Sequence, residues 1–173
     1  MDLLEAFAKI TTFVFDVDGV LTDGTLDIFD DGQMVRRMNI KDGYALQLAI
    51  KQGYNVVIIT GGNSEAVHDR LTRLGIKDVF IRVENKKKKL IEYIADKKLS
   101  SSEILFMGDD IPDYMAMQMI GLSCAPADAA AEIKSISRYV SPIKGGYGCA
   151  RDVIEKVLKL NDHWPMDTTT SSK

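Results

Sequence analysis

The chain has 173 residues and a mass of 19.2 kDa, and its 46% hydrophobic and 27% charged residues fit one globular domain rather than two catalytic domains. A net charge of −3 and a pI near 5.4 argue against nucleic acid as the main partner, because affinity for a polyanion comes largely from cationic side chains. The two cysteines and two histidines follow no metal-binding spacing, which argues against a zinc site.

The first residues are partly acidic and show no basic segment followed by a long apolar run, so they do not resemble a secretory signal. The sequence also contains no apolar stretch of 18 residues. These features predict a cytoplasmic protein with no membrane partner.

Short apolar runs alternate with segments of helical period along most of the chain. Strands are expected at 13–17, 56–59, 79–81, 104–107, 122–124 and 139–140, and helices at 43–52, 65–74, 87–98, 112–119, 129–135 and 150–160. This alternation is typical of a parallel sheet with crossover helices, so we predict an α/β fold with a Rossmann-like, doubly wound sheet.

Two segments depart from the alternation. The short strand-like runs 25–29 and 34–38 flank Asp30-Asp31-Gly32, a turn signal that predicts a β-hairpin projecting after the first strand. Residues 161–173 lack periodicity and have little to bury. We therefore expect a single domain of residues 1–160 followed by a flexible C-terminal tail of residues 161–173.

Carboxylate and hydroxyl side chains directly follow three of the predicted strands. Asp16 and Asp18 lie at the end of the first strand, Thr60 follows the second, and Asp109 closely follows the fourth. Ligands of doubly wound sheets bind beyond the carboxyl ends of the strands, so we expect these side chains to lie close together. A carboxylate can attack phosphorus, and oxygen ligands suit Mg²⁺, so the set favours phosphoryl transfer.

The order of these residues resembles the haloacid dehalogenase superfamily of phosphohydrolases over nearly the whole chain. The resemblance rests on Asp16-x-Asp18-Gly19-x-x-Thr22, then Thr60, a lysine, and Gly108-Asp109-Asp110-x-x-Asp113. It implies that Asp16 is a nucleophile forming an aspartyl-phosphate and that Asp18 is the general acid and base.

The same resemblance implies a Mg²⁺ site formed by Asp16, the backbone carbonyl of Asp18, and Asp109. It also implies that Thr60 binds a phosphoryl oxygen. The segment from Thr60 through Gly61 and Gly62 to Asn63 lies at a predicted helix N-terminus, where hydroxyl and backbone N–H groups bind anions, so these residues are expected to bind the substrate.

The catalytic lysine is one of the four residues Lys86 to Lys89. Lys89 is favoured because it immediately precedes Leu90-Ile91, where the apolar helical face begins and where the lysine of the family typically stands; Lys86 is the second choice. We expect Asp113, one helical turn from Asp109, to orient this lysine or to complete the outer shell of the metal.

The spacing of the motifs leaves no room for the cap domain that covers the substrate in many members of the superfamily. A capless site gives a small substrate few contacts, so another segment is expected to form the lid. The hairpin of residues 24–38 is the candidate, either on its own site or on a neighbouring one. We therefore expect a homotetramer in which the hairpin covers a neighbouring site.

Within the capless group, the chain is similar to the 3-deoxy-D-manno-octulosonate 8-phosphate (KDO 8-phosphate) phosphatases of lipopolysaccharide synthesis. The features that carry this similarity are 15–24, 39–43, 60–64 with Arg70, and the glycine-rich segment 145–153. The resemblance implies hydrolysis of KDO 8-phosphate to KDO and phosphate, with Arg70 reaching the carboxylate of the sugar acid.

Three alternatives stay open. Phosphatases of the nine-carbon analogue, 2-keto-3-deoxynonulosonate 9-phosphate, resemble the chain almost as well, but they tend to carry Glu where this sequence has Gly62, which favours the eight-carbon substrate. An open site would also admit a phosphoprotein or a nucleic-acid end. The third alternative is a non-catalytic domain that keeps the fold to bind a partner.

Overall fold

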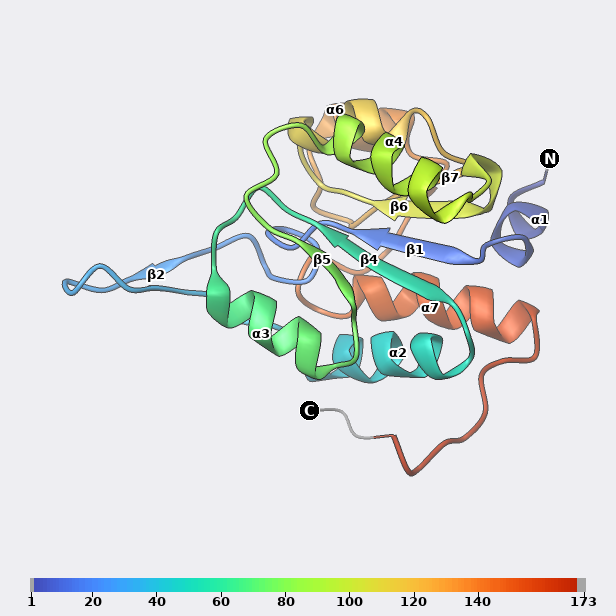
Figure 1. The fold of residues 1–173 in the computed structure, drawn as a ribbon, viewed down its shortest axis with the longest axis horizontal. Helices are drawn as coiled ribbons and strands as arrows, with labels where there is room; N and C mark the ends of the chain where they lie inside the picture. The colour runs from blue at the N-terminus through green and yellow to red at the C-terminus, as the bar shows by residue number, and fades with distance from the viewer. Residues whose placement is uncertain (1, 171–173) are drawn as a thin grey trace.

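A computed structural model describes residues 2–170 of the chain. Its centre is a six-stranded parallel sheet with the strand order β5-β4-β1-β6-β7-β8, as predicted for an α/β fold of this type (Figure 1). The strands are β1 Thr12–Phe15, β4 Asn55–Ile59, β5 Asp78–Phe80, β6 Ile104–Met107, β7 Leu122–Ala125 and β8 Tyr139–Val140. The central strand β1 pairs with β4 on one side and with β6 on the other, with Phe13 opposite Val56 and Leu105.

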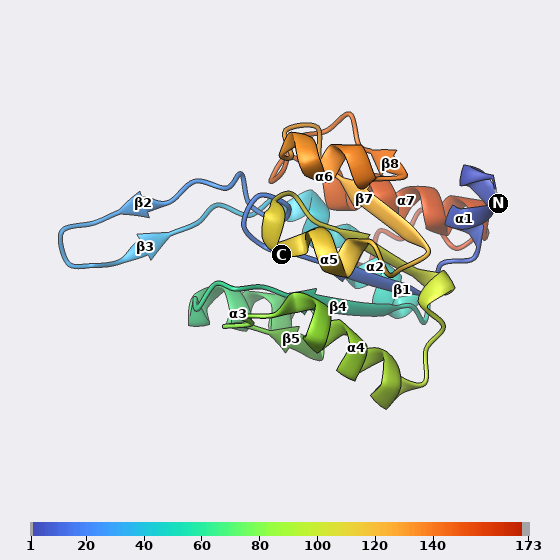
Figure 2. The same cartoon turned by 90° about the horizontal axis from the view of Figure 1, so that it is seen from above.

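Helices cover both faces of the sheet (Figures 1 and 2). One face carries α1 Leu3–Ala8, α2 Ile40–Lys51, α3 Glu65–Arg73 and α7 Cys149–Leu160. The other face carries α4 Lys86–Lys97, α5 Tyr114–Met117 and α6 Ala131–Ile136, and two short 3₁₀ turns, η1 Ser101–Glu103 and η2 Ile111–Asp113, flank β6. No helix among residues 2–170 is long and apolar enough to span a bilayer.

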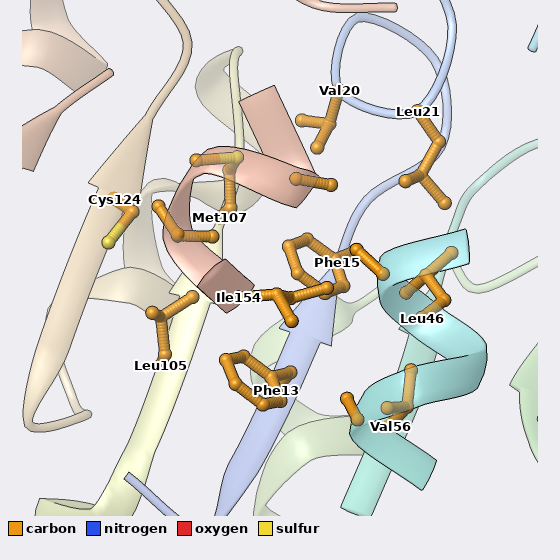
Figure 3. Packing of buried hydrophobic residues seen from close by; sticks show 14 of the residues in the cluster. Phe13, Phe15, Val20, Leu21, Leu46, Val56, Leu105, Met107, Cys124 and Ile154 are labelled. Atoms are coloured by element: carbon orange, nitrogen blue, oxygen red, sulfur yellow. The ribbon is translucent and has the colours of Figure 1, made fainter. Parts of the chain in front are cut away.

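The alternation of side chains along β1 supplies both hydrophobic layers. Phe13 and Phe15 point into the layer that contains α2 and α7, whereas Val14 points into the layer with α4 and α5. The two phenylalanine rings are nearly parallel, with centroids 6.2 Å apart, and Ile154 of α7 lies beside them (Figure 3). Each ring is fully buried, which stabilises the fold by about 2–3 kcal/mol. This packing fixes the carboxyl end of β1, where Asp16 follows.

The predicted helices exist, but several begin or end elsewhere. Helix α1 was not predicted from the sequence. Asp2 is its N-cap, and the buried Phe7 ring packs edge-on against Tyr139. Helix α2 begins three residues earlier than expected because the Asn39 side chain accepts a hydrogen bond from the Lys41 N–H.

The hairpin projects from the edge of the sheet where the parallel strands end (Figure 2). Its strands, β2 Asp27–Ile28 and β3 Met34–Val35, are shorter than predicted, and Gly32 adopts the positive φ of 85° that the turn requires. Large apolar side chains on it are exposed, namely Leu26, Ile28, Phe29, Met34 and Val35. The hairpin is therefore a projecting arm with exposed apolar side chains.

The segment after α7 contacts α2. Trp164 packs edge-on against Tyr44 of α2, and the Tyr44 hydroxyl donates a hydrogen bond to the Asp167 carbonyl at 3.0 Å. Lys51, at the end of α2, pairs with the Asp167 carboxylate at 3.2 Å and donates to the Thr170 hydroxyl. The sequence reasoning missed these contacts because single aromatic and polar residues without periodicity give no packing signal. Residues 171–173 of the predicted tail lie outside the described residues.

Candidate active site

The loop that follows β1 is a tight turn that presents two carboxylates. Asp16 directly follows the strand, its N–H donates to the Met107 carbonyl at 3.1 Å, and only 6% of the residue is exposed. The buried Thr22 hydroxyl accepts hydrogen bonds from the N–H groups of Gly19 and Gly24, so it closes the loop on itself. Gly19 has a φ of 91°, and a Cβ there would overlap the Asp109 carboxylate.

The glycine-rich segment before α7 supports this loop from behind. The N–H of Gly146 donates to the Val20 carbonyl at 2.9 Å. A Cβ on Gly145 would overlap the Gly19 carbonyl, and one on Gly146 would overlap the backbone at Thr22 and Asp23. The glycines therefore allow two backbones to approach closely, which holds the Asp16 loop in place.

A buried carboxylate anchors α7 to α2. Asp42 is 2% exposed, and its Oδ1 accepts a hydrogen bond from the Arg151 N–H in the first turn of α7 at 2.7 Å. Its other oxygen is buried without a hydrogen-bond partner. Burial raises the pKa of Asp42 from 3.8 to about 6, although the hydrogen bond to Arg151 lowers it.

We predict that Asp42→Asn stabilises the protein at neutral pH. The raised pKa means that the folded chain binds the Asp42 proton more tightly than the unfolded chain, so the charged form costs stability above about pH 6. Asn keeps the acceptor for Arg151 without the charge, and a shift of about 2 pKa units corresponds to roughly 3 kcal/mol as an upper limit. In urea titrations the gain should be present at pH 7.5 and disappear near pH 4. A destabilised Asp42→Asn at pH 7.5 would contradict this account, and Asp42→Ala, which also loses the acceptor, is the control.

Three carboxylates and one lysine form the buried centre of the site. Lys86 Nζ lies 2.9 Å from Asp16 Oδ1 and 2.7 Å from Asp113 Oδ1, and all three side chains are at most 9% exposed. Asp113 Oδ2 also accepts from the Asp109 N–H at 3.1 Å. Asp113 therefore contacts a lysine, Lys86, through a direct ion pair, as its predicted orienting role requires.

Lys89 does not lie in this centre, so the favoured lysine was wrong and the second choice, Lys86, occupies the position. Asn85 caps α4 and its side chain accepts from the Lys88 N–H, so the helix begins at Lys86, one residue earlier than predicted. Because α4 then leads away from the sheet edge, only its first residue reaches the carboxylates. Lys89 instead lies 4.6 Å above the Phe80 ring and 3.5 Å from Glu92.

The centre has more negative than positive charge, and the pKa values reflect this. Burial and the charge of Asp113 raise the pKa of Asp16 to about 6 despite the neighbouring Lys86. Burial and the charges of Asp16 and Asp113 raise the pKa of Asp109 to about 7. Burial lowers the pKa of Lys86, but attraction by Asp16 and Asp113 outweighs it and the net shift is upward. A further cation would relieve this imbalance.

The carboxylates fit a hard divalent cation. Asp16, Asp109 and Asp113 each offer an oxygen, and these oxygens lie within 4.8 Å of one another. Oδ1 of Asp109 is buried without a hydrogen-bond partner, and the Asp16 and Asp113 carboxylates share the single cation Lys86. Three clustered carboxylates with one cation among them suit Mg²⁺, which takes few protein ligands and completes its shell with water and phosphate oxygens. The contribution of the Asp18 carbonyl remains a prediction.

We predict that Mg²⁺ stabilises the fold and that the effect weakens in acid. Raised pKa values make the metal-free folded state bind protons more tightly than the unfolded state, so protons compete with Mg²⁺ as the pH falls through 7 towards 6. At a concentration of 100 times Kd, Mg²⁺ should add about 2.7 kcal/mol at pH 8. Thermal unfolding with Mg²⁺, against KCl at equal ionic strength, measures the effect. An increment that is independent of pH, or that survives in Asp109→Asn, would contradict the assignment.

An open pocket of about 760 Å³ lies above this centre at the carboxyl edge of the sheet. Asp16, Asp18, Asp109 and Lys86 line it together with the segment Thr60, Gly61, Gly62 and Asn63. Thr60 is 3% exposed and its hydroxyl accepts from the Gly62 N–H at 3.1 Å, which shapes the loop before α3. Ser64 is the N-cap of α3. The structure therefore brings together all the predicted site residues except Lys89 and Arg70.

Arg70 faces a neighbouring cavity of about 520 Å³ between α3 and the hairpin, and its Nε is buried without a hydrogen-bond partner. The sequence reasoning missed another arginine, Arg36, which pairs with Asp18 through Nε at 2.7 Å and Nη2 at 3.2 Å. No local motif marks Arg36, since the contact depends on the second strand of the hairpin returning beside the loop after β1.

The family comparison agrees with this site. Residues 43–127 match the family of haloacid dehalogenase-like hydrolases. The 3-deoxy-D-manno-octulosonate 8-phosphate phosphatase of Yersinia pestis is 32% identical over 93% of this chain and 86% of its own length. The enzyme of the same name from Escherichia coli K12 is 32% identical over 91% of this chain and 84% of its own length.

Solved structures show the same relationship. The crystal structure of the Yersinia pestis phosphatase superposes with a TM-score of 0.90, covering 93% of this chain and 87% of that one. The Moraxella catarrhalis phosphatase, solved in complex with magnesium ion, phosphate ion and KDO, is 28% identical with a TM-score of 0.89 and covers 92% of each chain. The chain belongs to the haloacid dehalogenase-like hydrolases, in the family of the 3-deoxy-D-manno-octulosonate 8-phosphate phosphatases.

Proposed function

We propose that the protein is a Mg²⁺-dependent phosphatase that hydrolyses KDO 8-phosphate to KDO and phosphate in lipopolysaccharide synthesis. The observation that carries the proposal is the buried centre of Asp16, Asp109, Asp113 and Lys86 beneath an open pocket. The Moraxella catarrhalis relative, crystallised with magnesium ion, phosphate ion and KDO, supports the substrate class.

Asp16 is the proposed nucleophile. Its carboxylate oxygen attacks phosphorus, the bond from phosphorus to the sugar oxygen breaks, and Asp18 donates a proton to the leaving oxygen. Asp18 then accepts a proton from a water molecule that attacks phosphorus, which releases phosphate and restores Asp16. Mg²⁺ held by Asp16 and Asp109 would neutralise charge on the phosphoryl oxygens.

Lys86 and the loop before α3 bind the phosphoryl group in this proposal. Lys86 Nζ, fixed between Asp16 and Asp113, places a positive charge beside the nucleophile. Thr60, Gly61, Gly62 and Asn63 line the pocket, and the Thr60 hydroxyl and the backbone N–H groups of Gly61 and Asn63 would donate hydrogen bonds to the phosphoryl oxygens. Arg70, in the adjacent cavity beside the hairpin, is the proposed partner of the sugar-acid carboxylate.

Assembly as a homotetramer completes the proposal. The exposed apolar side chains of the hairpin would be buried if residues 24–38 covered the site of a neighbouring subunit. Elution at the mass of a monomer in size-exclusion chromatography with light scattering would count against a tetramer. Two free, buried cysteines fit the reducing cytoplasm, where we place the enzyme.

Competing substrates test the assignment. Phosphate release should be measured with KDO 8-phosphate, its nine-carbon analogue, a phosphopeptide and a 5′-phosphorylated oligonucleotide. We expect the highest kcat/KM for the eight-carbon substrate and no significant turnover of the two macromolecular substrates. Preferred cleavage of a macromolecule would replace the sugar acid as the substrate class. Failure to cleave any phosphate ester would support the non-catalytic alternative instead.

A further inference from the structure

The hairpin contacts a predicted catalytic carboxylate of its own chain through Arg36. Arg36, directly after β3, donates from Nε to Asp18 Oδ1 at 2.7 Å and from Nη2 to Asp18 Oδ2 at 3.2 Å. The Arg36 side chain is 10% exposed and the Asp18 side chain 37% exposed. We propose that Arg36 is a positioning residue that orients the Asp18 carboxylate for proton transfer, an inference that rests on the proposed phosphatase function.

The backbone of the hairpin dictates which arginine reaches the site. Side chains of consecutive residues in an extended segment point to opposite sides, so Arg36 and Arg37 diverge. Arg37 is 80% exposed and lies 3.5 Å from Asp27 within the hairpin, whereas Arg36 turns towards Asp18. Thr22 and Met38 form an antiparallel bridge that joins the end of the hairpin to the loop after β1. The hairpin base and the Asp18 loop are therefore held in one register.

Gly62 leaves the space that this pair occupies. A Cβ at Gly62 would lie 3.2 Å from Asp18 Oδ2, 3.4 Å from Thr60 Oγ1 and 3.7 Å from Arg36 Nη2. The pair is thus enclosed on one side by the loop that is proposed to bind the phosphoryl group. A glycine at position 62 therefore leaves room for the Arg36–Asp18 pair, apart from any effect of this residue on the choice between eight-carbon and nine-carbon substrates.

The chemistry of a guanidinium suits a positioning role. A bidentate guanidinium fixes the plane of a carboxylate. Because arginine stays protonated, it does not accept the proton that Asp18 transfers. Lys86 contacts Asp16 and Asp113, whereas Arg36 contacts Asp18, so the proposed nucleophile and the proposed acid are held by different cations. The hairpin therefore forms part of its own active site, whatever it covers in a neighbouring subunit.

Steady-state kinetics with KDO 8-phosphate separate positioning from substrate binding. Arg36→Met should lower kcat by about 10- to 100-fold while KM changes less than about threefold, because a displaced proton donor slows chemistry without loss of a substrate contact. Arg36→Lys should recover part of kcat, since one donor remains. Arg37→Met, the neighbouring arginine of the hairpin that does not contact Asp18, is the matched control, and its loss of kcat should be at least about tenfold smaller than that of Arg36→Met. An unchanged kcat, or a rise in KM alone, would overturn the proposal.

A double-mutant cycle asks whether Arg36 acts through Asp18. In an Asp18→Asn background, Arg36→Met should cause no further loss of kcat, because the group that it orients no longer transfers a proton. Equal losses in both backgrounds would show that Arg36 acts elsewhere. Thermal unfolding of each variant in Mg²⁺ identifies any variant whose loss comes from misfolding.

A spectroscopic measurement keeps this inference separate from the proposed substrate. The Nε–Hε resonance of Arg36, assigned by its absence in Arg36→Lys, should shift in Asp18→Asn but not in Arg37→Met. A resonance that is insensitive to Asp18→Asn would refute the pair, even in a protein that cleaves KDO 8-phosphate. If wild type cleaves p-nitrophenyl phosphate but not KDO 8-phosphate, the proposed substrate is wrong, and the same kinetic comparison tests Arg36 with the aryl ester.

Discussion

Asp16→Asn is expected to abolish the release of phosphate from KDO 8-phosphate. The amide is a poor nucleophile, and removal of a nucleophile from a covalent mechanism typically costs about 10⁴-fold or more in kcat. Asp16 lies at the carboxyl end of the fully buried β1, and its N–H is bound to the Met107 carbonyl, so the backbone at this position should stay in place in the variant. Phosphate release in Mg²⁺, with wild type and variant at equal concentration, measures the loss.

The same variant should fold normally, which separates chemistry from stability. Burial raises the pKa of Asp16 to about 6, so the charged carboxylate is unfavourable in the metal-free fold at pH 7.5. Asp16→Asn removes that charge, and the Tm without Mg²⁺ should be equal to or above that of the wild type. Activity that survives in a folded Asp16→Asn would refute Asp16 as the nucleophile.

Lys86→Met is expected to reduce both activity and stability. The substitution removes the positive charge beside Asp16 and leaves Asp16 and Asp113 buried without their cation. Breaking a buried ion pair by removing one partner costs about 3–5 kcal/mol, and loss of one group that stabilises transition-state charge costs about 10²- to 10³-fold in kcat. Urea titration and kcat at saturating substrate measure the two effects.

Lys89→Met is the matched control for this prediction. Lys89 lies on the same helix, three residues further on, and its contacts are the Phe80 ring and Glu92 at the surface. We expect kcat within about twofold of the wild type and a change in unfolding free energy below about 1 kcal/mol. A larger loss of kcat in Lys89→Met than in Lys86→Met would restore the original choice of lysine.

The fold and the carboxylate centre could be predicted because they follow from local patterns. Three of the apolar runs end next to a polar site residue, and parallel strands bring Asp16, Thr60 and Asp109 to one edge of the sheet whatever the details of the helices. Asp-Asp-Gly between two strand-like runs likewise predicts the hairpin from the requirement for a positive φ at Gly32.

The rest depends on contacts between distant segments. The choice between Lys86 and Lys89 depends on where α4 begins. The cap at Asn85 places Lys86 at the sheet edge, whereas Lys89 lies three residues, about 4.5 Å, further along the helix axis and contacts Phe80 and Glu92. The pairing of Arg36 with Asp18 requires the returning end of the hairpin to lie beside the loop after β1. The packing of Trp164 on Tyr44 joins segments more than one hundred residues apart, which no short-range pattern records.

The most direct test of the proposed function is the kcat/KM of the wild type for KDO 8-phosphate and for its nine-carbon analogue, each with Mg²⁺ and with EDTA. We expect Mg²⁺-dependent release of phosphate, on the order of 10⁴ M⁻¹s⁻¹ or more for the eight-carbon substrate, and at least about tenfold less for the analogue. Equal or reversed preference would contradict the eight-carbon assignment. Release of phosphate that persists in EDTA or in Asp16→Asn would contradict the assigned chemistry itself.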